Sequence, residues 1–182
     1  VNDFIKGEIG MNIVVIGSMN MDYVLTTDNL PKKGETIHAI DFKTSIGGKG
    51  ANQAFAARKL GADVVMIGSV GNDDNGRKII NRMNEVGIDT SRIEIVNTET
   101  GNAMITVDNN GNNTIIVYGG ANKCVNKEII DKNEDAIIKA DFVIFQLEIP
   151  IETVEYGIEL AKKHNTKVIL NPAPAKILSD NI

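Results

Sequence analysis

Two polar residues near the N-terminus have types and a spacing that suit binding of a polyol. In Gly17–Asp22 (GSMNMD), Asn20 and Asp22 are two residues apart, so in an extended backbone both side chains point to the same side. A carboxylate accepts hydrogen bonds that sugar hydroxyls donate, and the neighbouring amide supplies both donors and an acceptor. Asn and Asp are also common in turns, so these residues alone are compatible with either a sugar site or a turn.

A glycine-rich segment follows at Ile46–Ala54 (IGGKGANQA) and leads directly into a helical pattern. The first turn of a helix offers free N–H groups, and glycines let a ligand approach the backbone closely. Lys49 and Asn52 add side-chain donors. The segment is not a P-loop, because Gly50 rather than Ser or Thr follows Lys49, and it lacks the spacing of a Rossmann fingerprint. A tight turn with a solvated lysine is the alternative interpretation.

Glu148, in the segment Gln146–Pro150, follows an apolar stretch that reads as a strand. The Asn20/Asp22 pair also follows such a strand, and ligands of open α/β sheets bind at the carboxyl ends of the strands. We therefore expect these acidic and amide groups to converge, although Glu148 could instead be an acid at a helix N-terminus. The proline-containing loop Asn171–Ala175 is expected to shape the same edge. The run Asn72–Gly76 is interpreted as a helix cap rather than a cation site.

The elements that position these residues alternate between strands and helices. Short apolar runs bounded by glycine or polar residues predict buried parallel strands at Asn12–Gly17, Val64–Gly68, Phe142–Leu147 and Lys167–Leu170. Apolar residues at helical spacing predict helices at Ala51–Leu60, Asn75–Val86, Glu128–Lys139 and Ile151–Lys163. This order is typical of a parallel sheet covered by helices.

Two regions interrupt that alternation and predict a small separate sheet. Tyr23–Phe42 holds two strand-like stretches, YVLTT and ETIHAIDF, around a turn at Pro31–Gly34. In Gly101–Tyr118, the alternation of residues 101–107, the turn at Asp108–Gly111 and the return through residues 114–118 predict an antiparallel hairpin.

Composition excludes several classes of protein. The chain has 182 residues, 42% of them hydrophobic, and a net charge of -5 without basic clusters, so a nucleic-acid surface is not expected. No apolar run approaches the roughly 18 residues of a membrane helix. The single cysteine, Cys124, forms no intrachain disulfide, which favours the cytoplasm. Residues 1–10 are interpreted as an extension, linker or tag, because Met11 immediately precedes the first strand.

Six motifs together resemble the ribokinase branch of the PfkB carbohydrate kinases. They occur in the family's order and span about residues 12–182: GSMNMD, IGGKGANQA, GSVGNDDNG, YGGAN, QLEIP and NPAPA. The resemblance implies a doubly wound parallel α/β sheet over residues 11–182, with a small antiparallel β lid formed by segments at about 21–42 and 101–118. It also implies ATP-dependent phosphorylation of D-ribose at its 5-hydroxyl, with Mg²⁺ and K⁺, and the possibility of a homodimer formed through the lids.

The resemblance assigns substrate-binding roles to residues of three segments: Asn20, Met21, Asp22, Gly48, Lys49, Gly50, Ala51, Asn52 and Glu148. The family's second motif, D-T-x-G-A-G-D, is absent from these 182 residues. The catalytic base, the nucleotide pocket and the cation loop are therefore expected beyond Ile182, no metal site is expected within the chain, and the chain alone is predicted to be inactive.

Three alternatives remain open at this point. The chain could belong to another PfkB kinase, of the fructokinase or adenosine kinase type, or it could be a sugar-binding module without catalysis. The coding sequence after Ile182 distinguishes kinase from module. An NAD-dependent enzyme is disfavoured, because the dinucleotide fingerprint is missing.

Overall fold

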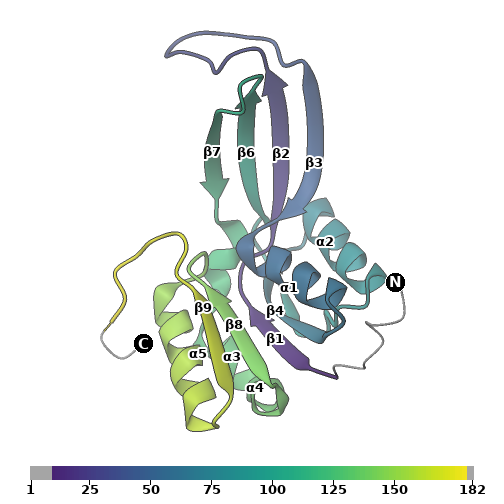
Figure 1. Ribbon diagram of the computed structural model, residues 1–182, viewed down its shortest axis with the longest axis vertical. Coiled ribbons are helices and arrows are strands. Elements are labelled where there is room, and N and C mark those ends of the chain that lie inside the picture. The colour runs from purple at the N-terminus through teal and green to yellow at the C-terminus, as the bar shows by residue number, and fades with distance from the viewer. Residues whose placement is uncertain (1–9, 180–182) are drawn as a thin grey trace, which may run out of the picture.

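The computed structural model describes residues 10–179, which form two sheets that stand at different levels of the molecule (Figure 1). The larger sheet has five strands in the order β5-β4-β1-β8-β9, and every neighbouring pair is parallel. Its strands are β1 (Asn12–Ile16), β4 (Asp63–Gly71), β5 (Ile93–Val96), β8 (Phe142–Gln146) and β9 (Lys167–Asn171). This confirms the predicted parallel sheet and the four strands recognised in the sequence. The short strand β5 was not predicted.

Helices cover both faces of this sheet. Successive residues of a strand point to opposite faces, so the apolar side chains of one strand can pack against helices on both sides. Val14 and Ile16 of β1 pack with one set of helices, and Val15 between them packs with the other. The first set is α3 (Lys127–Lys132), α4 (Glu134–Lys139) and α5 (Ile151–Lys163). The second set is α1 (Lys49–Lys59) and α2 (Asp74–Glu85). The fold is therefore doubly wound, as the sequence predicts.

The sequence predicts one helix over Glu128–Lys139, and this prediction was wrong. The structure divides the segment into α3 and α4 at Asn133. The side-chain amide of this buried asparagine donates to Ile129 O at 2.7 Å, and its side-chain oxygen accepts from Arg92. Side chains of this type compete with the helical backbone for hydrogen bonds, which accounts for the break.

The smaller sheet, which we call the lid sheet, projects above the carboxyl ends of the parallel strands (Figure 1). Its order is β3-β2-β6-β7. Its strands are β2 (Asn20–Thr27), β3 (Asp41–Gly47), β6 (Gly101–Asp108) and β7 (Asn113–Tyr118). β6 and β7 pair antiparallel, which confirms the predicted hairpin. β2 and β6 pair in parallel, so the sheet is mixed rather than purely antiparallel as expected.

The second strand of the first lid segment was misplaced by the sequence pattern. The residues Glu35–Ile40 form no strand, and β3 instead runs from Asp41 to Gly47. The register explains the shift, because β3 pairs along β2 from Thr26–Asp41 to Asn20–Gly47. Residues before Asp41 therefore lie past the paired part of β2 and have no neighbouring strand. Ile40 N still donates to Thr26 O.

No helix within residues 10–179 is long and apolar enough to cross a membrane. The sequence interpretation of residues 1–10 falls almost entirely outside the described residues.

Candidate functional site

The candidate site lies where β1 and β8 end side by side. Ile16 pairs with Phe145 in the parallel register, so the loop after β1 meets the segment that carries Glu148. The hydroxyl of Ser18 donates to Glu148 Oε2 at 2.6 Å across 130 residues of sequence. Ser18 is fully buried, and Glu148 is partly buried. The predicted convergence of these strand ends is therefore present in the fold.

The N-terminus of α1 completes this side of the site. Lys49 N donates to the same Glu148 oxygen at 2.9 Å, and Gly50 N donates to the Ser18 hydroxyl at 3.3 Å. The positive end of a helix stabilises a carboxylate, so Glu148 is held at α1 by its Oε2 atom. Its other oxygen, Oε1, lies 3.9 Å from the Lys49 ammonium, whereas Oε2 accepts from both Ser18 and Lys49 N.

The glycines of this segment are required by close approaches. Gly48 has a φ of 87°, which disfavours any residue with a side chain. A Cβ at Gly50 would lie 2.6 Å from Ser18 N. The glycine run therefore lets the start of α1 pack directly on the loop after β1.

Asn20 and Asp22 reach the site from β2. Asn20 is opposite Gly47, and a Cβ on Gly47 would lie 2.0 Å from Asp22 Oδ2. Asn20 is 4% exposed and Asp22 is partly buried. The two side chains share one face of the lid sheet, because they are two residues apart on one strand.

The electrostatics of Asp22 are unusual for an aspartate. Burial raises the pKa of the Asp22 carboxyl above its ordinary value of 3.8, and the nearby negative charge of Glu148 raises it further. A carboxylate that is held ionised against desolvation and a like charge gains from a hydroxyl that donates to it. Perturbed carboxyls of this kind cluster at functional sites.

The remaining predicted site residues occupy different surroundings. Met21 and Ala51 have side chains in the apolar core, at 4% and 0% exposure, so they contribute through backbone or packing. Asn52 is exposed on the first turn of α1. Asp73 caps α2 by accepting from Gly76 N at 2.7 Å, which confirms the capping interpretation of that segment.

Two buried residues that contact the site were missed at the sequence level. Ser18 lies inside the quoted motif GSMNMD, and its position one residue past Gly17 was a usable signal. Asn122 contacts Asn20 and Met19 from the 3₁₀ helix η1 (Gly120–Cys124). Its only sequence signal was its place in the motif YGGAN.

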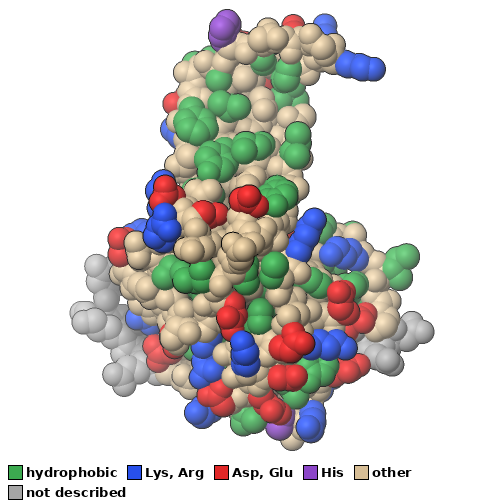
Figure 2. Space-filling model, turned by 180° about the vertical axis from the view of Figure 1, so that it is seen from behind, with side chains coloured by type: hydrophobic (Ala, Val, Ile, Leu, Met, Phe, Trp, Pro, Cys, Tyr) green, Lys and Arg blue, Asp and Glu red, His purple; other side chains and the backbone are tan. Residues whose placement is uncertain are grey.

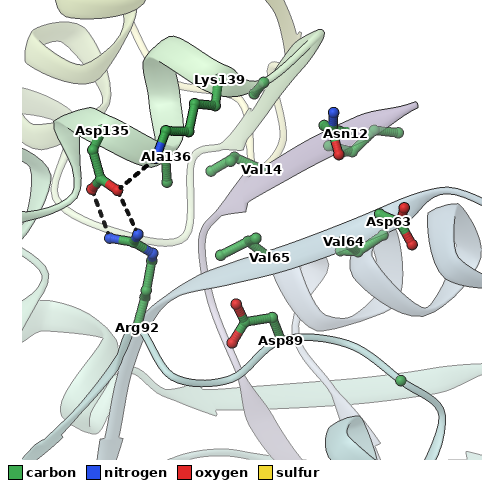
Figure 3. Close-up of a pocket in the computed structure, with 13 residues that line it drawn as sticks. Asn12, Val14, Asp63, Val64, Val65, Asp89, Arg92, Asp135, Ala136 and Lys139 are labelled. Atoms are coloured by element: carbon green, nitrogen blue, oxygen red, sulfur yellow. Dashed lines mark hydrogen bonds and ion pairs between the residues drawn. The ribbon is translucent and has the colours of Figure 1, made fainter. Parts of the chain in front are cut away.

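A cavity of about 600 Å³ lies at the other end of the sheet (Figure 3). It is lined by the amino-terminal ends of β1 and β4. Its main charged groups pair with one another: Arg92 binds both oxygens of Asp135, and Lys139 lies 3.7 Å from the same carboxylate. Because ligands of open parallel sheets bind at the carboxyl ends, we place the site at Glu148 and not in this cavity.

Comparison with known proteins decides the family. Residues 11–182 match the model of the pfkB family carbohydrate kinases. The chain belongs to this family. The resemblance inferred from the motifs is thereby confirmed.

Individual pfkB relatives are similar over nearly all of this chain. The ribokinase of Haemophilus influenzae is 41% identical over 171 residues, which are 93% of this chain and 56% of that protein. The deoxyribokinase of Salmonella typhi is 44% identical over 166 residues, or 91% of this chain and 54% of that protein. The structure of Arabidopsis thaliana ribokinase complexed with ribose and ATP superposes with a TM-score of 0.80 at 34% identity, and the match covers 89% of this chain and 53% of that one. The chain thus spans about half the length of these pfkB proteins.

Proposed function

We propose that this chain is the sugar-binding part of an ATP-dependent carbohydrate kinase that phosphorylates D-ribose at its 5-hydroxyl. The observation that carries the proposal is the convergence of Asn20, Asp22 and Glu148 on the N-terminus of α1. Two carboxylates, an amide and a lysine in one place suit a ligand with several neighbouring hydroxyls. Relatives named ribokinase, and a ribokinase structure with bound ribose, support ribose as the sugar.

In this proposal, the chain's residues bind and orient the sugar. Asp22 and Oε1 of Glu148 accept hydrogen bonds from hydroxyls, and Asn20 and Lys49 donate to them. Backbone groups of Gly48 complete the contacts, whereas the N–H groups of Lys49 and Gly50 hold Glu148 and Ser18 in place. The proposed site also includes residues of the segments that hold these groups: Met21, Gly50, Ala51 and Asn52. Rigid positioning of this kind contributes to phosphoryl transfer chiefly through proximity.

ATP, Mg²⁺ and K⁺ belong to the proposal for the whole kinase. Residues 10–179 contain no group of three His, Cys, Asp or Glu side chains that could hold a metal ion. Mg²⁺ is usually held by one or two carboxylates together with the phosphates of its nucleotide, and we propose that the residues that bind the nucleotide and both cations follow Ile182. We expect the chain alone to be inactive.

The lid sheet supports a further part of the proposal, a homodimer. Exposed apolar side chains gather on the lid, as the green patches of its upper part show (Figure 2). Ile115 and Val117 of β7 are each 54% exposed and lie on the same face as Asp22, through the pairs Ile105–Ile115 and Ala103–Val117. Packing of two such faces would remove apolar surface from water. We expect sedimentation to detect dimers that Ile115→Asp dissociates.

We also propose that the whole protein is cytoplasmic.

Two measurements test the proposed function. The first is coupled ADP release by the purified chain with ribose, ATP, Mg²⁺ and K⁺, for which we expect no turnover above background. A rate near ~1 s⁻¹, which is ordinary for an enzyme, would place the catalytic residues inside this chain and refute the division of the site.

The second measurement is calorimetric titration of the chain with ribose, 2-deoxyribose, fructose and adenosine. We expect the strongest binding for ribose. Preference for fructose or adenosine would replace ribose with the substrate of another kinase type, and no binding of any of the four would refute the sugar site.

A further inference from the structure

Asn122 is a buried amide whose own orientation is fixed by the backbone. It is 1% exposed. Its Oδ1 accepts from Met19 N at 2.9 Å, and its Nδ2 donates to Met19 O at 3.2 Å. A backbone N–H can only donate and a carbonyl can only accept, so the amide of Asn122 cannot be turned around without losing both bonds. One proton of Nδ2 remains for another partner.

That remaining proton decides which way Asn20 faces. Asn122 Nδ2 donates to Asn20 Oδ1 at 2.7 Å. Because Asn122 presents a donor here, Asn20 must present its oxygen to it, and the NH₂ group of Asn20 points away. Within residues 10–179, no hydrogen bond engages the Asn20 NH₂ group, and this group is not one of the fully buried side-chain atoms that lack a partner, which are Ser69 Oγ and Gln146 Oε1. The NH₂ group therefore reaches the surface from a side chain that is otherwise 4% exposed, and a ligand there can accept a hydrogen bond from it.

Gly101 provides the space for this pair. It lies opposite Asn20 at the start of β6, and a Cβ there would come within 2.2 Å of Asn122 Nδ2 and 2.3 Å of Asn20 Oδ1. Any side chain at position 101 would therefore separate the two amides.

We propose that Asn122 is a positioning residue that sets the polarity of the sugar site. It holds Asn20 with its NH₂ group toward the ligand, next to the carboxylate of Asp22. A hydroxyl of the sugar then accepts a hydrogen bond from Asn20 and donates one to Asp22. The inference rests on the proposed function for the identity of the ligand. The orientation of Asn20 itself is a property of the free chain.

The first test uses proton NMR of the side-chain amides in the ¹⁵N-labelled chain without ligand. We expect the Asn122 NH₂ protons to exchange slowly with water, because both are hydrogen-bonded, and the Asn20 NH₂ protons to exchange faster. Gly101→Ala and Asn122→Ala should each change the Asn20 signals. Slow exchange at Asn20 with fast exchange at Asn122 would overturn the proposal, whatever the chain binds.

The second test adds ribose. We expect the Asn20 NH₂ signals to shift on binding, and Asn122→Asp to weaken ribose affinity by roughly tenfold or more, since a carboxylate at 122 would turn the donor of Asn20 away from the sugar. Asn133→Asp is the matched control, because it makes the same replacement at a buried amide that donates to a backbone carbonyl, that of Ile129, between α3 and α4. It should lower the melting temperature without changing the affinity.

The outcomes separate the two ideas. If the Asn122 and Asn133 variants both lose stability and neither loses affinity, Asn122 is merely structural and the proposal fails. If the parent chain binds no ribose, the proposed function fails, and the amide exchange of the free chain still decides the orientation of Asn20.

Discussion

Asp22 should contribute to binding while it destabilises the fold, and this opposition makes it the most informative residue to change. In Asp22→Ala, the sugar loses a hydrogen bond to a charged acceptor. Such bonds contribute about 1.5–3 kcal/mol, which corresponds to a roughly 10- to 150-fold weaker Kd for ribose. The partly buried position of Asp22 places this estimate above that of an exposed carboxylate.

The stability effect has the opposite sign. The folded-state pKa of Asp22 is raised above 3.8 by burial and then by Glu148, so just above pH 3.8 the folded chain keeps a proton that the unfolded chain has lost. The retained proton stabilises the folded chain, and this stabilisation is lost as the pH rises through the raised pKa. At pH 7, the isosteric variant Asp22→Asn should therefore unfold at a higher urea concentration than the parent chain, and the difference should shrink toward pH 4.

Ribose calorimetry and urea unfolding at both pH values measure the two effects. Asp41→Ala is the control, because Asp41 is an exposed lid carboxylate paired with Lys43 and lies away from the site. Its ribose affinity should be unchanged. Unchanged affinity in Asp22→Ala, or a loss of stability in Asp22→Asn at pH 7, would refute the reasoning.

Two further substitutions test a contact that holds Glu148 in the site and the cap of helix α2. Ser18→Ala removes the 2.6 Å bond to Glu148 and should weaken ribose binding roughly threefold to tenfold, less than the loss of Asp22, because Ser18 acts on the sugar only by positioning Glu148. Calorimetry that finds no change would show that the helix N-terminus alone positions Glu148. Burial tends to raise the pKa of Asp73, but hydrogen bonds from Thr100 and Gly76 lower that pKa below 3.8 overall. The ionised carboxylate therefore stabilises the fold above pH 3.8, and this stabilisation is lost as the pH falls through the lowered pKa. Asp73→Ala should cost about 1–2 kcal/mol of unfolding free energy at pH 7, with a smaller difference in acid, and an equal loss at every pH would contradict the ionic origin.

The predictable part of the fold was carried by local patterns. Strands such as Phe142–Gln146 are short apolar runs, and the hairpin of Gly101–Tyr118 combines alternation with a turn sequence. β5 (Ile93–Val96) has only four residues, too few for a pattern to be distinctive. The start of β3 depends on where β2 ends, which is a pairing property and not a local one.

The site divides in the same way. Asn20, Asp22 and Glu148 could be recognised because their types and their places after strands suggest ligand contacts. Ser18 and Asn122 act through partners about 100 or more residues away, Glu148 and Asn20 respectively. Such contacts exist only once the sheet has assembled, so the places of Ser18 and Asn122 within sequence motifs do not reveal which partners they bind.

We expect the sugar to bind at the carboxyl ends of β1 and β8. A ribose titration followed by two-dimensional ¹H–¹⁵N NMR of the chain tests it directly. We predict that the backbone signals of Asn20, Asp22 and Lys49 shift with ribose, while those of Arg92 and Asp135 at the opposite cavity stay in place. Shifts confined to Arg92 and Asp135, with the signals of Asn20, Asp22 and Lys49 unmoved, would contradict the account.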